Sequence, residues 1–160
     1  MAKITDLKGE WAVAVGRAMI AFGSIEHVTV VCLRNIPRDP LHKSTAALSL
    51  VPRVELLLEI LAARPGKVFS ELANGLSRIK PLAKIRNLIA HNPLVLQVFE
   101  AENGDYGFKE LIVALHKEQS ISLPQLQKFA DEAEQLAAEL LQCSSAVFST
   151  ICASATTPPK

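Results

Sequence analysis

The sequence predicts a mainly α-helical fold, a bundle of four to five helices with one β-hairpin before the last helix. Apolar residues recur every three to four positions over long stretches, as in amphipathic helices, while residues 108–116 alternate between apolar and other types. Prolines and glycines fall between these stretches. With 160 residues, 49% of them hydrophobic, the chain can bury one core. We therefore expect a single domain over residues 1–153 and a flexible tail over residues 154–160.

The first helix is predicted over about residues 5–35, where apolar side chains have helical spacing. Pro37 and Pro40 follow it, and proline does not continue a helix. Gly16 and Gly23 lie seven residues apart on nearly the same face of this helix. Glycines in that arrangement predict a close approach of another helix.

Two further helical regions precede the hairpin. The second covers residues 43–63, and its firm part is expected to begin near Val51 with Pro52 in the first turn. The third covers residues 67–91, and Pro81 is expected to kink it or to restart it as a separate helix.

The hairpin is predicted from residues 94–100, which have strand propensity, and residues 108–116, which return after a turn-rich segment. A short loop followed by more helix is the alternative for this region. Leu123 and Pro124 open the last helix, which we expect to continue to about Cys152.

Three polar side chains stand at the end of the third helical region, Arg86, Asn87 and His91. Arg86 is a permanent cation with five donors, and His91 can exchange protons near neutral pH. Asn87 and His91 share a helix face, whereas Arg86 lies about 140° around the helix from His91. Arg86 therefore reaches partway around its own helix or meets the histidine of a second copy. Asn92 and Pro93 predict the helix end, with Asn92 in the left-handed conformation.

These side chains have the chemistry for RNA cleavage without a metal ion. The reaction needs a base for the ribose 2′-OH, a cation for the charged phosphorane and an acid for the leaving oxygen. His91 can act as base or acid, and Arg86 can hold the phosphate and stabilise the transition state. Asn87 can orient His91 or a phosphate oxygen. One histidine is few for two proton transfers, which favours a dimer with facing motif helices. The alternative is that Arg86, Asn87 and His91 have no catalytic role and only cap the helix and form hydrogen bonds.

The segment Arg86-Asn87-Leu88-Ile89-Ala90-His91 resembles the signature of the HEPN family, R-x4-6-H with an asparagine often after the arginine. The run Phe22-Gly23-Ser24-Ile25-Glu26-His27 is similar to the first helix of HEPN proteins, where an acidic residue faces the motif helix. The resemblance thus assigns a supporting role to Glu26, with a solvent-facing glutamate as the alternative, and Asn92 is the second supporting residue. Helix order extends the resemblance over roughly residues 5–152, which implies a HEPN-like bundle.

HEPN ribonucleases place their paired motifs at a dimer interface. The resemblance therefore implies an endoribonuclease that acts on RNA as a homodimer, with Arg86, Asn87 and His91 as catalytic residues. It also implies a toxin or a defence or stress ribonuclease, with an antitoxin protein as a candidate partner. HEPN proteins paired with a minimal nucleotidyltransferase antitoxin often carry a tyrosine two residues after the histidine, where this chain has Pro93. The alternative function is a non-catalytic helical dimer that binds a protein or RNA; a small-molecule or nucleotide pocket in the bundle is a third candidate.

The net charge of the chain is +1, so RNA binding requires a local basic patch. No acidic residue lies between Glu71 and Glu100, whereas Arg78, Lys80 and Lys84 fall in that interval. We predict that these three cations bind the RNA backbone. The alternative is an ordinary solvated face.

Other features argue against several protein classes. The three cysteines are widely spaced and form neither a disulfide framework nor a metal-binding pattern, which favours a reducing cytoplasm. The four histidines lack the spacing of zinc or di-iron sites and no P-loop is present, so no metal or cofactor is expected. The N-terminus does not resemble a signal peptide, and no uninterrupted apolar run approaches the roughly 20 residues of a membrane span. We therefore predict a cytoplasmic protein without membrane contact.

Overall fold

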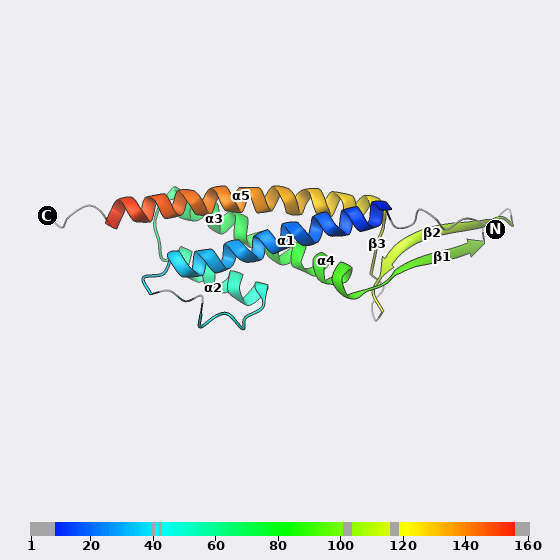
Figure 1. The fold of residues 1–160 in the computed structure, drawn as a ribbon, viewed down its shortest axis with the longest axis horizontal. Coiled ribbons are helices and arrows are strands. Elements are labelled where there is room, and N and C mark those ends of the chain that lie inside the picture. The colour runs from blue at the N-terminus through cyan, green and yellow to red at the C-terminus, as the bar shows by residue number, and fades with distance from the viewer. Residues whose placement is uncertain (1–8, 40, 42, 101–103, 116–118, 156–160) are drawn as a thin grey trace.

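The computed structural model describes residues 9–39, 41, 43–100, 104–115 and 119–155. Its elements follow in the order α1 (Gly9–Asn35), α2 (Leu50–Ala62), α3 (Lys67–Ser77), α4 (Ile79–His91), β1 (Leu94–Glu100), β2 (Tyr106–Val113), β3 (Ser120–Ile121) and α5 (Leu123–Ala155). The helices form an elongated bundle, and the strands form a small antiparallel sheet at one end of it (Figure 1). The predicted mainly α-helical class, with strands before the last helix, is confirmed.

The two long helices α1 and α5 lie side by side and run in the same direction, while α3 and α4 run the opposite way (Figure 1). The rings of Phe22 on α1 and Phe129 on α5 stack with 5.7 Å between their centroids. The largest fully buried side chains come from all five described helices and the residue after α1: Phe22, Ile25, Val28, Leu33, Ile36, Leu57, Leu72, Leu76, Ile79, Leu126, Leu136 and Leu140. The bundle therefore has one continuous core.

Prolines set two helix boundaries as predicted. Pro52 is the third residue of α2, and Pro81 is the third residue of α4. A first-turn proline loses no intrahelical hydrogen bond, because the first N–H groups of a helix have no acceptor within it. The third helical region accordingly divides at Arg78 into α3 and α4. This restart gives the motif segment its own helix.

The predicted hairpin is present, and a third strand joins it. β1 pairs antiparallel with β2, from the Leu94–Ile112 pair to the Glu100–Tyr106 pair. The two-residue strand β3 pairs with the last two residues of β2, which the sequence did not predict. The Nε1 of Trp11 on α1 donates a hydrogen bond of 2.7 Å to Glu110 Oε2 on β2, so the sheet is tied to the bundle near its base.

One face of the hairpin carries five exposed apolar side chains beside Glu100 and Glu110. Directly paired residues and alternate residues along a strand share a face, which places Leu94, Leu96, Val98, Tyr106 and Phe108 together. All five are exposed, Tyr106 at 67% and Phe108 at 62%. The hairpin projects beyond the end of the bundle (Figure 1), so no described helix covers these residues, which we call the exposed hairpin face.

The end of the last helix differs from the prediction. α5 continues past Cys152 to Ala155, two residues into the predicted tail. Residues 156–160 lie outside the described residues, as do residues 5–8 of the predicted first helix. Turns of helix that extend past the last core side chains are difficult to predict because periodic burial no longer marks them.

The outer face of α1, which we define as Val13, Gly16, Ile20 and Gly23, is open. No described heavy atom lies within 4 Å of a Cβ built on Gly16 or Gly23, apart from their own chain neighbours and helix backbone. The expected close approach of another helix is therefore wrong within the described part of this chain. Val13 and Ile20 are exposed on the same face.

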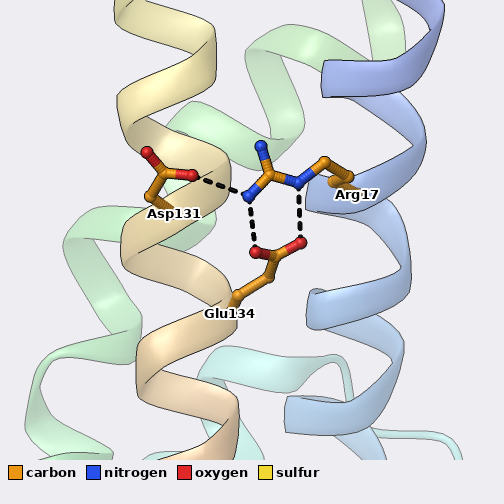
Figure 2. A network of polar contacts seen from close by, with 3 residues as sticks. All are labelled: Arg17, Asp131 and Glu134. Atoms are coloured by element: carbon orange, nitrogen blue, oxygen red, sulfur yellow. Dashed lines mark hydrogen bonds and ion pairs between the residues drawn. The ribbon is translucent and has the colours of Figure 1, made fainter.

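An ion-pair cluster joins the two long helices. Arg17 of α1 donates from Nε and Nη2 to the two carboxylate oxygens of Glu134, at 2.9 and 2.6 Å (Figure 2). The same Nη2 also lies 2.6 Å from Asp131 Oδ1 (Figure 2). The hydrogen bond from Arg17 lowers the pKa of Glu134 below its ordinary value.

This cluster predicts a pH-dependent contribution to stability. A carboxyl whose pKa is lowered by folding stabilises the native state above its ordinary pKa of about 4.3, and this stabilisation is lost as pH falls through the lower native pKa. We expect Glu134→Gln to have a lower melting temperature than the wild type at pH 7, with the difference shrinking below about pH 4. Melts followed by circular dichroism from pH 7 to pH 3 measure it. Glu132→Gln, whose partner Lys128 is 3.8 Å away, should show a smaller difference at pH 7; equal differences for both variants would contradict the prediction.

Burial makes Cys32 unreactive in the native protein. Its side chain is 0% exposed, and desolvation raises the pKa of the thiol to about 12. We expect thiol reagents to label the exposed Cys152 in the folded protein and Cys32 only after unfolding in urea. Mass spectrometry of labelled peptides measures both rates. Labelling of Cys32 at the rate of Cys152 without urea would show that the core is open.

Two helices have the length and hydropathy of a membrane span, Gly9–Asn35 and Leu123–Ser154. Core helices of soluble proteins meet the same criteria, so the finding is weak support for a membrane location. Both helices also carry charged side chains, Arg17 on α1 and Asp131 and Glu134 on α5, which are costly inside a lipid bilayer. The cytoplasmic, membrane-free location therefore stays a prediction.

Candidate functional site

Helix α4 presents the predicted catalytic arginine to a carboxylate of α1. Arg86 Nη2 lies 3.0 Å from Glu26 Oε1, and Arg86 Nη1 donates to Asn87 Oδ1 at 3.2 Å. The side chains of Arg86 and Glu26 are 32% and 33% exposed, so the ion pair is partly shielded from water. Of the two interpretations of Glu26, the one that faces it toward the motif helix agrees with this geometry.

The Arg86 side chain borders a cavity of about 260 Å³ between three helices. Among its lining residues are Glu26 from α1, Arg86 and Asn87 from α4, and Ser49, Val51 and Arg53 from the start of α2. Arg53 was not among the predicted site residues. It is the fourth residue of α2, where a positive charge opposes the positive end of the helix dipole. That unfavourable position is a sequence signal by which it could have been found.

Both arginines of the cavity hold an enclosed N–H without an acceptor. The Nε atoms of Arg53 and Arg86 are buried and have no hydrogen-bond partner in the described structure. A buried donor without an acceptor costs about 1–3 kcal/mol. Because almost no surface of either atom is open, an oxygen in the cavity cannot reach them without movement of the surrounding side chains.

His91 is the last residue of α4 and is exposed. It follows Asn87 by one turn, about 6 Å along the helix axis, and it does not line the cavity. The three predicted catalytic residues thus divide into Arg86 and Asn87 at the cavity and His91 beyond its edge. A substrate that joins them must extend from the cavity along α4.

Asn92 connects the motif helix to the segment after the hairpin. Its Nδ2 donates to the carbonyl oxygen of Leu88 at 2.8 Å, and its Oδ1 accepts from the backbone N–H of Leu115 at 3.1 Å. Its φ of −129° and ψ of 149° are extended, so the predicted left-handed conformation is wrong. The side-chain amide, which satisfies a terminal carbonyl directly, ends the helix instead.

The predicted basic patch is largely neutralised by glutamates from other helices. Arg78 pairs with Glu139 of α5 at 2.5 Å, and Lys80 pairs with Glu55 of α2 at 2.6 Å. Lys84 is exposed, and no ion pair to it is found in the described structure. Pairing weakens the field that would attract a phosphate backbone. RNA binding by these three residues stays a prediction.

Two larger cavities lie elsewhere in the described structure. One of about 520 Å³ borders the start of α1, including Arg17, and one of about 320 Å³ lies between α4, β3 and α5. Neither is lined by a predicted site residue. Within the described residues, no three histidine, cysteine, aspartate or glutamate side chains are grouped as a metal site requires.

Comparison of the chain with protein-family models, with curated proteins and with solved structures gave no match in any of the three. The geometry around Arg86 and the sequence resemblance are therefore the two indications of function.

Proposed function

We propose that the chain is a metal-independent endoribonuclease of the HEPN type. The observation that carries the proposal is the cluster of Glu26, Arg86 and Asn87 at one cavity, with His91 one helical turn away. A carboxylate and an amide fix the arginine at two of its nitrogens, so its remaining donors are held in place for an anion. Fixed donors of this kind stabilise a transition state without reorganisation at the moment of reaction.

Each motif residue has a distinct role in this mechanism. Arg86 binds the phosphate and stabilises the negative charge of the phosphorane. His91 takes the proton from the ribose 2′-OH or gives one to the leaving 5′ oxygen. Asn87 lies between them on α4 and orients the phosphate or the imidazole. Glu26 positions Arg86, and Asn92 positions the end of the motif helix.

We further propose that the active site is shared by two copies of the chain. One motif histidine per chain is few for two proton transfers, and a second copy supplies another. The exposed hairpin face favours this arrangement, because β1 begins at Leu94, three residues after His91. A copy that covered this face would lie beside the motif.

The same face favours the second candidate function, a non-catalytic helical dimer that binds a protein or RNA. Exposed apolar surface of this kind marks interaction sites in soluble proteins. In either case we propose a cytoplasmic toxin, defence or stress factor, for which an antitoxin would be one protein partner. No metal or cofactor enters the mechanism.

The proposal is tested by incubating the purified wild type with a labelled RNA in EDTA. Cleavage that persists in EDTA and yields 2′,3′-cyclic phosphate ends agrees with the proposed mechanism. A wild type that does not cleave the RNA would contradict the ribonuclease proposal and favour the second candidate function, a non-catalytic dimer that binds a protein or RNA. Cleavage by a species that is monomeric in light scattering would contradict the shared site.

A further inference from the structure

Arg53 and Arg86 meet at one cavity with a single carboxylate between them. Two guanidinium groups and Glu26 leave the lining with an excess of one positive charge. Glu26 is already engaged by Arg86, whereas no ion pair to Arg53 is found in the described structure. The excess charge of the cavity therefore resides on Arg53, and an anion would balance it.

The start of α2 adds further donors at the same cavity. Ser49 precedes the helix in an extended conformation, and its side chain makes no capping hydrogen bond. The first turn contains no acidic residue. Pro52 has no N–H, and the N–H of Arg53 already donates to the carbonyl oxygen of Ser49 at 3.3 Å. The backbone donors left in this turn are those of Leu50 and Val51, which carry a partial positive charge. These donors and the two guanidinium groups approach the cavity from two helices.

The size of the cavity restricts the ligand. Drug-sized ligands occupy pockets of about 300–1,000 Å³, and this cavity of about 260 Å³ falls below that range. It suits one tetrahedral oxyanion with the rest of the molecule outside. Oxyanion oxygens are strong acceptors for guanidinium donors, which both Arg53 and Arg86 bring to this cavity.

We propose that this cavity is an oxyanion site in which Arg53 and Arg86 together bind one backbone phosphate of RNA. The oxyanion chemistry follows from the cavity alone, and its assignment to RNA rests on the proposed function. Arg53 then fixes the register of the strand, which continues past Asn87 toward His91. A second cation from α2 makes α2 part of the substrate-binding surface.

The direct test is binding of an oligonucleotide that cannot be cleaved. A fluorescent octanucleotide with 2′-fluoro sugars lacks the attacking hydroxyl, and its anisotropy in EDTA reports binding only. We expect Arg53→Gln to weaken binding by about 10-fold or more, because a hydrogen bond to a charged group is lost. The slope of log affinity against log salt should fall by about 0.7, the value for one phosphate contact on a single strand. Arg53→Lys should lose less.

Arg34→Gln is the matched control, because Arg34 is an exposed arginine in the last turn of α1 and does not line the cavity. It should bind within about two-fold of the wild type. Circular dichroism and the melting temperature establish that each variant is folded. Wild-type affinity and salt slope in Arg53→Gln would overturn the inference, and so would an equal loss in Arg34→Gln.

Inorganic phosphate distinguishes the source of the oxyanion. If phosphate raises the melting temperature of the wild type but not of Arg53→Gln, at matched ionic strength, the oxyanion site is supported even when the oligonucleotide does not bind. The assignment to RNA would then fail together with the proposed function. Binding of the oligonucleotide through Arg53 without any cleavage would support the site and remove only the ribonuclease. If neither phosphate nor the oligonucleotide has an effect, the oxyanion site is overturned. The ribonuclease proposal is then judged separately, by cleavage of RNA.

Discussion

Replacing either Arg86 or His91 with alanine is expected to reduce RNA cleavage in EDTA by at least about 100-fold. His91 supplies proton transfer, which contributes about 10²–10⁴-fold to enzymatic rates. Arg86 supplies a fixed cation at the phosphate, and loss of one such donor costs about 10²–10³-fold. Initial rates on a labelled RNA measure both effects. Variants that cleave as fast as the wild type would show that the motif is structural.

The stability of these variants must be separated from their chemistry. Arg86→Ala leaves the partly buried Glu26 without its cation, which costs on the order of 1 kcal/mol, or about 2–4 °C in melting temperature. Arg17→Ala is the matched control, because it also removes an arginine that pairs with glutamate and is 39% exposed. Arg17 precedes Glu26 by nine residues, about 13 Å along α1 and on its opposite side. This variant should keep wild-type cleavage.

The helix boundaries could be predicted where a single residue determines them. Pro52 and Pro81 each begin a helix because a proline is tolerated in the first turn and disrupts later ones. These effects act within one turn of the chain, so sequence alone contains them. The end of α4 was placed correctly for a different reason, since Asn92 ends it through its amide and not through a left-handed backbone.

The electrostatics of the site could not be predicted in the same way. Arg78 and Lys80 stand in a stretch of sequence without acidic residues, but Glu139 and Glu55 reach them from α5 and α2. Whether a charge is paired depends on packing between helices that are distant in sequence. The pairing of Arg86 with Glu26, 60 residues away, was expected only through the family resemblance.

The surroundings of Arg53 show the same dependence on tertiary structure. Its position near a helix start is a local signal, but the cavity forms only when α2 packs beside α4 and α1.

The strands of the hairpin could be predicted from local sequence, but their exposure could not. Strand propensity was sufficient to predict β1 and β2, yet alternation alone does not tell which face another element covers. Exposure of the apolar face is therefore a finding of the structure.

Phe108→Glu is expected to convert a dimer of this chain to monomers. Phe108 and Tyr106 are about two-thirds exposed, and since an aromatic side chain can bury about 150–250 Å², the pair leaves on the order of 250 Å² open to water. A second copy can pack its own hairpin face against this one by two-fold symmetry, which would bury Phe108 of both copies. A buried charge at the centre of such an interface should weaken dimerisation by at least about 100-fold. Sedimentation over a range of concentrations measures this change.

Ile20→Glu is the control for that experiment, because Ile20 is 75% exposed on the outer face of α1. It adds the same charge to an apolar residue and should leave the mass unchanged if the hairpin forms the dimer. The melting temperature of Phe108→Glu at low concentration should stay near that of the wild-type monomer, since the side chain is exposed in one copy. RNA cleavage by Phe108→Glu should fall with the dimer fraction, because the proposed active site needs His91 from both copies. A dimer that persists in Phe108→Glu but dissociates in Ile20→Glu would place the interface on α1. The exposed hairpin face would then be available to a different protein, as the binding-module function requires.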